Sequence, residues 1–188
     1  MWHTSFASGA EFPDPHAQGY TQFGDDGTTV VATNWNPSFA WSAGAMISAL
    51  EDLHTWVPAV ATGALPSPAT QQQRLRFVHD DGRVADDGYG LGIFNLAGWI
   101  GHNGSLPGYQ TVAVYLPERQ MTLVVLVNTD IGAPDGMEPS AVVANAVTSV
   151  VAPDHPYPVE QKPRPPRITG WKAPSPFTWP HPPTRSGI

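Results

Sequence analysis

The sequence predicts an α/β fold of the α+β type, in which an antiparallel sheet is covered by helices. Residues 89–128 carry this prediction, because four strand-like runs follow one another there with only short turns between them. Connections of this length join antiparallel strands. Residues 37–63 and 140–151 flank the strands and hold apolar side chains at helical spacing, so each segment has a face that can cover the sheet.

The N-terminal segment, residues 1–37, is rich in Gly, Pro, Asp and Thr, a composition that favours turns over long elements. Asp25-Asp26-Gly27 predicts a tight turn, flanked by strand-like residues at 22–23 and 28–31. The first residues lack the basic stretch and apolar core of a secretory signal peptide, and no apolar run is long enough to span a bilayer. We therefore expect the chain to begin like the interior of a domain.

Residues 37–63 are expected to be mostly helical. Pro37 suits a first helical turn, and Ser48-Ala-Leu-Glu51 has the spacing of a capping box. Gly63 is a natural stop for this segment. Pro58 lies inside the apolar pattern, so we expect it to kink the helix or to break it.

The remaining elements follow the same reasoning. A short helix is expected to begin at residues 67–70 and to carry residues 71–75. Residues 123–127 are continuously apolar, which is typical of a strand covered on both faces. Residues 140–151 fit a closing helix that packs on the sheet. The expected strands are residues 89–95, 99–103, 109–116 and 121–128.

Composition excludes several kinds of site. Residues 1–152 hold four basic side chains, none of them lysine, against fourteen acidic ones, which argues against binding of nucleic acid. The chain has no cysteine, so disulfides and cysteine-ligated zinc sites are excluded. Its histidines show no His-Glu-X-X-His spacing. We therefore expect neither a metal ion nor another cofactor.

Residues 153–188 differ from the body formed by residues 1–152. They hold eleven of the 21 prolines, interleaved with Trp171, Phe177 and Trp179. A segment of this kind cannot form a helix or a central strand, so we expect an extended or disordered tail. Docking of its aromatic side chains on the body and recognition by a partner as a polyproline ligand are the alternatives.

Four short motifs occur in one order along the body. They are Trp41-Ser-Ala-Gly-Ala-Met-Ile-Ser48, Tyr89-Gly-Leu-Gly92, Gly101-His-Asn-Gly104 and Leu126-Val-Asn128. Their order and spacing resemble the C-terminal half of the serine β-lactamase-like family, which groups class C β-lactamases, D-alanyl-D-alanine carboxypeptidases and related esterases. The chain is most similar to the carboxypeptidase and esterase branch, where the third motif is His-X-Gly rather than Lys-Thr-Gly. The resemblance covers about residues 1–152 and implies a partial β-lactamase/transpeptidase-like fold.

The chemistry of this family needs a Ser-X-X-Lys pair, a Tyr-X-Asn or Ser-X-Asn loop and the His-X-Gly strand. No serine of this chain is followed by a lysine three positions later, and no tyrosine is followed by X-Asn. We expect both motifs upstream of Met1 in a full-length relative. The resemblance thus implies a fragment of a serine hydrolase that is inactive alone, whose parent cleaves a small-molecule or peptide acyl substrate.

Two alternatives remain open at this point. The chain could be a non-catalytic binding module that keeps the cleft wall and uses its proline-rich tail for partners. It could also be a truncated or split gene product with little stable fold. Relatives are commonly exported to the cell envelope, but the sequence itself indicates no compartment.

The resemblance assigns roles to five residues. His102 is expected to line the cleft and to donate a hydrogen bond to a substrate carboxylate or to the tyrosine-type base; the alternative is a half-buried strand histidine. Ser105 contributes its backbone amide to the oxyanion hole. Asn103, Gly104 and Asn128 are expected to form the substrate-binding part of the site. Gly104 lets the substrate backbone approach, whereas strand alternation turns the Asn103 side chain away from the cleft. Asn128 lies near the cleft rim or is simply a turn residue at the strand end.

Overall fold

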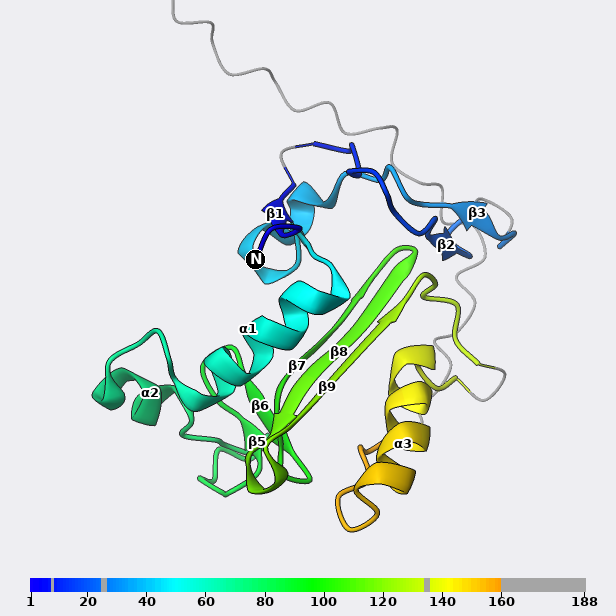
Figure 1. Cartoon of the computed structure of the whole chain (residues 1–188). Helices are drawn as coiled ribbons and strands as arrows, with labels where there is room; N and C mark the ends of the chain where they lie inside the picture. Colours follow the sequence, from blue (N-terminus) through cyan, green and yellow to red (C-terminus); the bar gives the residue numbers. More distant parts are fainter. Residues whose placement is uncertain (8, 25–26, 134–135, 160–188) are drawn as a thin grey trace, which may run out of the picture.

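The protein is described by a computed structural model that covers residues 1–7, 9–24, 27–133 and 136–159. Its centre is a five-stranded antiparallel sheet in the order β5-β6-β7-β8-β9. Helix α1 (Leu50–Thr62) contacts one face, and helix α3 (Pro139–Val151) contacts the other (Figure 1). The strands are β5 (Gly88–Tyr89), β6 (Phe94–Leu96), β7 (Trp99–Leu106), β8 (Tyr109–Leu116) and β9 (Met121–Val127). The expected α+β class, an antiparallel sheet covered by helices, is confirmed.

The hydrophobic core lies between the sheet and α3. Strand β8 alternates between buried and half-buried residues, and its buried set is Gln110, Val112, Val114 and Leu116. These side chains point to one face because successive strand residues point in opposite directions. The three apolar members of this set form one cluster with Trp99, Ala144 and Tyr157. We call this side of the sheet the α3 face.

Helix α1 covers part of the opposite face, where it contacts β7, β8 and β9. The capping box expected at Ser48 is wrong: Ala49 occupies the N-cap and makes no side-chain cap hydrogen bond. The Ser48 hydroxyl instead bonds the hydroxyl of Thr4, at 2.8 Å. Pro58 does not break the helix, which continues to Thr62 and ends at Gly63 in the left-handed conformation, as expected.

Residues 37–47 are not the start of a long helix. They form the 3-10 helix η1 (Pro37–Ala43) and the short strand β4 (Met46–Ile47), which pairs with β1 (Ser5–Phe6). The backbone turns away from helical geometry at Trp41, where φ is 44° and ψ is −132°. Pairing with a strand distant in the sequence has overridden the local helix preference of this alanine-rich stretch.

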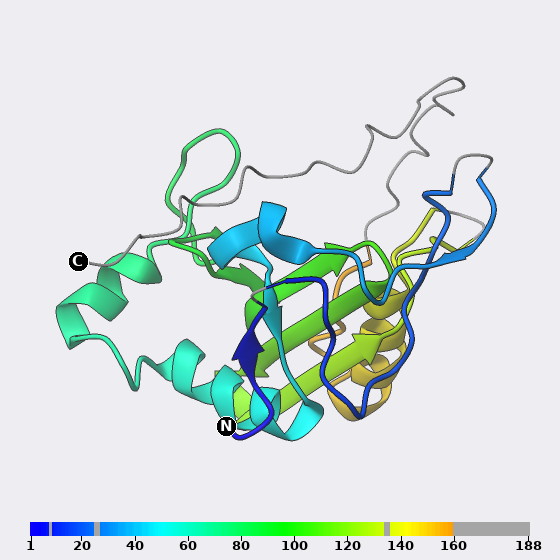
Figure 2. The same cartoon turned by 90° about the horizontal axis from the view of Figure 1, so that it is seen from above.

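The expected N-terminal hairpin exists with shifted strands. Residues Tyr20–Thr21 (β2) pair with Val30–Val31 (β3), so residues 22–23 belong to the connection rather than to a strand. Asp25 and Asp26 lie outside the described residues. The Tyr20 amide donates to the Asn128 carbonyl at 3.0 Å, which places β2 beside the end of β9 (Figure 2).

The strand-like run at residues 89–95 is also divided. It forms β5 and β6, which pair with each other across a tight turn. Gly90 is required there, because a Cβ would lie 2.2 Å from the Arg74 carbonyl oxygen. The expected short helix is present as α2 (Pro68–Arg74), capped by Ser67. Strand β7 continues past residue 103 to Leu106, where a turn leads to β8.

Residues 153–157 follow α3 and pack against the body, although the sequence analysis assigns them to the tail. Tyr157 is only 3% exposed, and its amide donates to the Thr148 hydroxyl at 2.7 Å. The Trp99 indole donates to the His155 carbonyl at 2.8 Å. The rest of the expected tail, residues 160–188, lies outside the described residues. Within the part that the structure describes, no helix has the length and apolar character needed to cross a bilayer.

Candidate functional site

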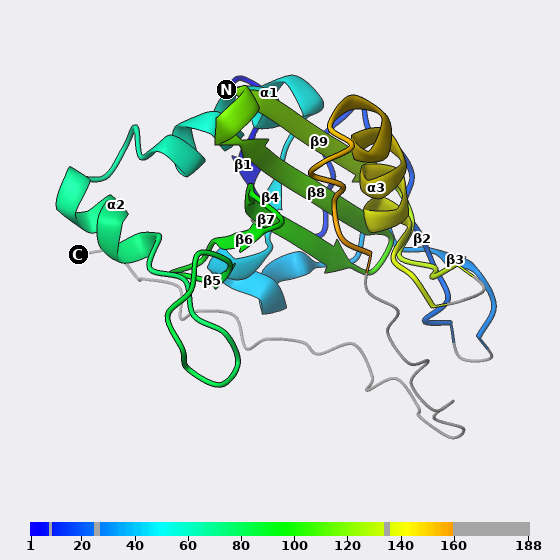
Figure 3. The same ribbon diagram turned by 90° about the horizontal axis from the view of Figure 1, so that it is seen from below.

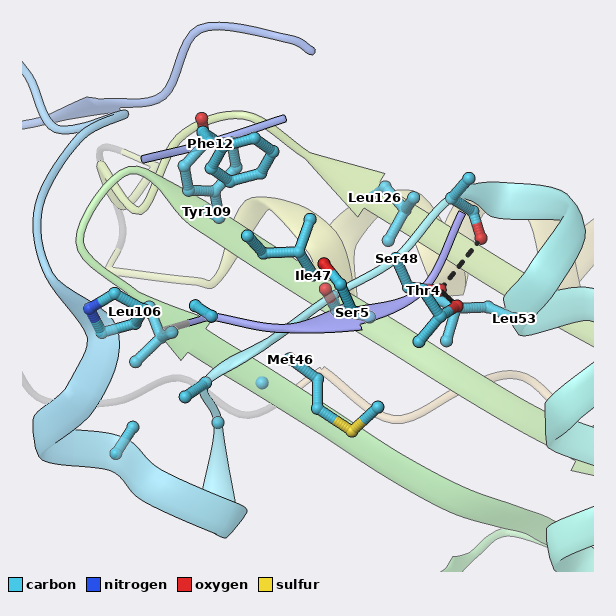
Figure 4. A pocket seen from close by; sticks show the side chains of 18 of the residues that line it. Thr4, Ser5, Phe12, Met46, Ile47, Ser48, Leu53, Leu106, Tyr109 and Leu126 are labelled. Carbon is cyan, nitrogen blue, oxygen red and sulfur yellow. Dashed lines mark hydrogen bonds between the residues drawn. The ribbon is translucent and has the colours of Figure 1, made fainter. Parts of the chain in front are cut away.

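A large cleft lies on the face of the sheet opposite α3. Side chains from β1, β4, η1 and α1 line it on one side, and residues of β7, β8 and the end of β9 line it on the other (Figure 4). Its volume is about 2900 Å³. Pockets for small molecules usually measure roughly 300–1,000 Å³, so this cleft is wider than one bound ligand requires. Seen from below, η1 lies beyond β7, whereas β1 and β4 lie behind the sheet (Figure 3).

Strand alternation determines which part of the Gly101–Gly104 motif faces this cleft. Asn103 pairs with Val112 and Ser105 with Gln110, and both partners are buried on the α3 face. The side chains of Asn103 and Ser105 therefore point away from the cleft, as predicted for Asn103. The Ser105 hydroxyl lies 3.5 Å from the Gln110 amide nitrogen, which can donate to it. His102 lies on the cleft face.

One edge of β7 is unpaired beside the cleft. β6 pairs with β7 only as far as Gly101, whereas β8 pairs with β7 as far as Leu106. Among the described residues, no strand therefore pairs with residues 102–106 on the side of β6. An unpaired edge offers backbone N–H and C=O groups to an extended ligand.

The two glycines of the motif have different reasons to be glycine. At Gly101 a Cβ would lie 2.2 Å from the Ala113 carbonyl oxygen, so the approach of β8 requires glycine. At Gly104 a Cβ would meet no atom within 4 Å, and the residue is exposed. The described part of the protein therefore does not itself require glycine at position 104.

The His102 ring is held by contacts at both nitrogens. Its Nε2 lies 2.7 Å from the Tyr89 hydroxyl, and its Nδ1 bonds the carbonyl oxygen of Asn103. The ring also meets Tyr89 edge-on, with centroids 5.6 Å apart, and Phe94 at 5.5 Å. These contacts fix the ring plane against β5 and β6.

Tyr89 is a site residue that the sequence analysis missed. It reaches His102 because β5 turns back onto β6 through Gly90 and Gly92, and Gly92 has a φ of 66°. The sequence shows the Tyr89-Gly-Leu-Gly92 motif but not its proximity to His102. That proximity depends on the division of one strand-like run into two paired strands.

Asn128 directly follows β9 and lines the cleft at its rim. Its side-chain amide donates to the Gln18 carbonyl at 2.9 Å, and its own carbonyl accepts from Tyr20. Asn128 thus holds the N-terminal segment against the end of the sheet. A contact from this side chain to substrate stays a prediction.

Asp52 is the buried carboxylate beside the cleft. It accepts hydrogen bonds from the Thr4 hydroxyl at 2.7 Å, the His3 amide at 2.8 Å and the Trp2 amide at 3.1 Å. The Thr4 bond, followed by the two amide bonds, lowers the pKa of Asp52 although burial opposes this shift. A carboxylate with a lowered pKa is a weak general base. The role that its hydrogen bonds support for Asp52 is to anchor residues 2–4, directly before β1, to α1.

One group of three side chains in the described part of the chain could together offer ligands to a cation. Glu118, Asp154 and His155 gather where the C-terminal end of α3 meets the turn between β8 and β9. The Arg119 guanidinium already pairs with Asp154, and His155 Nε2 lies 3.1 Å from a Glu118 oxygen. The Arg119–Asp154 ion pair and the His155–Glu118 contact fasten residues 154–155 to the turn between β8 and β9.

Comparisons with known proteins add a family match and a fold match. The family model described as Beta-lactamase matches residues 1–148. A D-stereospecific amidohydrolase from Streptomyces sp. is similar, with 24% identity, a TM-score of 0.59 and coverage of 69% of this chain and 40% of that one. A D-amino acid amidase from Ochrobactrum anthropi SV3, complexed with L-phenylalanine amide, has 24% identity, a TM-score of 0.56 and coverage of 70% and 40%.

A penicillin binding protein from Bacillus halodurans is also similar, with 17% identity, a TM-score of 0.52 and coverage of 79% of this chain and 44% of that one. At these identities the likeness shows the fold alone. The chain spans less than half the length of each of these three structures.

Proposed function

The chain belongs to the beta-lactamase family, and from this premise we propose that it supplies the sheet wall of an acyl-serine hydrolase site. In this proposal the carbonyl of an amide, lactam or ester lies against β7. A serine attacks it to form an acyl-serine, which water then hydrolyses. His102, Gly104 and the Ser105 amide form the wall, and the amide is one oxyanion donor.

The observation that carries the proposal is the open space over Gly104 on the unpaired edge of β7. Gly101 is explained by the approach of β8, but no neighbouring atom of the described residues explains Gly104. A glycine in the interior of a strand weakens the strand, and it often marks a place where a ligand or another backbone approaches closely. An extended acyl substrate that pairs with residues 102–106 would use both the free edge and the missing side chain.

The nucleophile and its base are proposed to come from polypeptide outside these 188 residues. The sequence contains no serine followed three positions later by lysine. The solved structures that resemble the chain are more than twice the length that it matches. The width of the cleft and the exposure of Phe39 and Trp41 beside it agree with a surface on which further polypeptide packs.

Binding to the isolated chain tests the wall. D-phenylalanine amide, added to the ¹⁵N-labelled chain, is expected to shift the backbone resonances of residues 102–106. Gly104→Val should weaken this binding by about tenfold or more, because the side chain fills the space over the free edge. Gly132→Val is the matched control, since a Cβ there makes only contacts of 3.7–3.9 Å and lies outside the cleft lining.

Turnover tests the missing nucleophile. The chain alone is expected to leave nitrocefin, p-nitrophenyl acetate and D-phenylalanine amide unchanged. Fusion to the part of the Streptomyces amidohydrolase that this chain does not cover is expected to restore turnover that Gly104→Val reduces. Steady turnover by the unfused chain, blocked by a serine-reactive probe, would contradict the proposed source of the nucleophile. Equal binding by wild type and Gly104→Val would contradict the proposed wall.

A further inference from the structure

His102 offers a substrate no free ring nitrogen in this structure. A carbonyl oxygen only accepts hydrogen bonds, so the bond between Nδ1 and the Asn103 carbonyl requires a proton on Nδ1. In the neutral ring Nε2 then has no proton, and it accepts from the Tyr89 hydroxyl at 2.7 Å. The two partners together select one tautomer and occupy both nitrogens.

This arrangement conflicts with the carboxylate-binding role expected for His102. A carboxylate accepts hydrogen bonds and donates none, so it needs a free donor on the wall. Nδ1–H already donates to Asn103, and Nε2 has no proton to give. A carboxylate could bind His102 only after one of these two bonds had been broken.

The charged side chains around the cleft also disfavour a carboxylate ligand. Glu11, Asp14 and Glu51 line the cleft, whereas Arg74 is the one Lys or Arg side chain among the described lining residues. The Arg74 guanidinium donates to the Val60 carbonyl, on α1, at 3.4 Å. A cleft with an excess of carboxylates raises the energy of an anionic ligand relative to a neutral one.

We propose that Tyr89 is a positioning residue that holds His102 in the Nδ1–H tautomer, and that the wall thereby selects neutral acyl substrates over those bearing a carboxylate beside the scissile bond. This inference rests on the proposed function, because it concerns the ligand of the same wall. Tyr89 acts through His102: it has no place in the lining of the cleft itself. The substrate class is that of neutral amides and esters.

The tautomer is tested first, at about pH 8, above the range in which an ordinary histidine titrates. Long-range ¹H–¹⁵N spectra of the labelled chain are expected to show a protonated Nδ1 and an unprotonated Nε2 for His102. Tyr89→Phe should move the Nε2 signal, since the hydroxyl donor is gone. Tyr109→Phe is the matched control: it removes a hydroxyl from the same cleft, one that donates to the Ala17 carbonyl, and should leave the His102 signals in place.

Selectivity is tested with two compounds of similar shape that share one scissile amide, N-phenylacetylglycinamide and N-phenylacetylglycine, of which only the second bears a carboxylate beside that bond. We expect wild type to bind the neutral compound about tenfold more tightly than the carboxylate, read from the shifts of residues 102–106. Tyr89→Phe should reduce this preference to less than about threefold, because without the hydroxyl donor Nε2 can carry a proton and donate it to the carboxylate. Tyr109→Phe should keep the wild-type preference.

The outcomes separate this inference from the function on which it rests. N-phenylacetylglycine binding as tightly as N-phenylacetylglycinamide, or an Nε2 signal that Tyr89→Phe leaves unmoved, overturns the inference and leaves the wall in place. Failure of both compounds to shift residues 102–106 overturns the proposed function and the inference with it. A Tyr89→Phe variant that has lost the dispersed spectrum of wild type is replaced by Tyr89→Trp, which also lacks the hydroxyl and for which the same loss of preference is expected.

Discussion

The two faces of the central sheet are both apolar, yet they differ in how fully they are covered. On the α3 face, Trp99 is fully buried and Leu116 is 1% exposed. Around the cleft, Phe39 is 73% exposed and Trp41 is 69% exposed. Burial of apolar surface stabilises a fold by roughly 25 cal/mol per Å², so the α3 face contributes to stability while the cleft keeps its apolar area for what binds there. Hydrophobic composition alone does not distinguish a core from a binding wall.

The largest expected difference in stability is between the replacement of a tryptophan on the α3 face and the replacement of one beside the cleft. Trp99→Ala should lower the free energy of unfolding by about 3–5 kcal/mol, because it opens a cavity in the core and removes the indole donor to the His155 carbonyl. Trp41→Ala should change it by about 1 kcal/mol or less, since that side chain is largely exposed and its ring meets Phe6 edge-on. Urea unfolding followed by far-ultraviolet circular dichroism measures both. Losses of similar size would show that the cleft face also contributes to the core.

A smaller effect is expected from two threonines that make the same local bond in different surroundings. Thr148 is fully buried; its hydroxyl donates to the Ala144 carbonyl and accepts from the Tyr157 amide. Thr148→Val leaves that amide without a partner and should cost about 1–3 kcal/mol. Thr62→Val removes only an exposed bond to the Pro58 carbonyl and should cost about 0.5 kcal/mol or less.

Thermal unfolding of the two threonine variants gives the comparison directly. A cost at Thr148 no larger than that at Thr62 would mean that residues 153–157 do not stabilise the α3 face. A larger cost at Thr148, as expected, would show that the stabilising contacts of the α3 face continue beyond the end of α3 into residues 153–157.

The sequence predicts best those elements whose apolar pattern arises because one of their faces packs on the core. Residues 109–116 alternate and residues 140–151 repeat at helical spacing, and both form as expected because each packs on the same core. The segment at residues 37–47 was mispredicted because its partner, β1, lies about forty residues away in the sequence. Ser48 failed as a cap for the same reason: its hydroxyl bonds Thr4.

The candidate site likewise contains residues that the sequence could predict and one that it could not. The motif resemblance identified the family and pointed to His102 and Gly104, and the structure puts both on the cleft face or the free edge of β7. It did not reveal Tyr89, since the Tyr89–His102 contact requires the turn that Gly90 permits beside the Arg74 carbonyl. Contacts made by folding one strand-like run back on itself leave no periodic signal in the sequence.

The smallest expected effect concerns how the stability of the cleft side changes at acid pH. Asp52 is the buried carboxylate that anchors this side. The Thr4 hydroxyl and the amides of His3 and Trp2 lower the pKa of Asp52 below its ordinary value of 3.8. A carboxyl whose pKa is lower in the folded state contributes stability that is fully present above the unfolded value and is lost as pH falls through the folded value. The stability due to this anchor should therefore persist at neutral pH and disappear below about pH 4.

The variant Asp52→Asn tests whether the stability contributed by Asp52 is lost as the pH falls. The variant keeps an acceptor oxygen but loses the charge, so its melting temperature should lie below that of wild type at pH 7, and the gap should close as the pH is lowered past 3.8. Thr4→Val removes the largest cause of the lowered pKa. In this background the difference in melting temperature between Asp52 and Asp52→Asn should be smaller than in wild type but not zero, because the two amide donors remain. A gap that stays constant down to pH 2.5 would mean that Asp52 stabilises the cleft side by its shape rather than by its charge. The cleft side would then resemble the α3 face, where neutral contacts dominate.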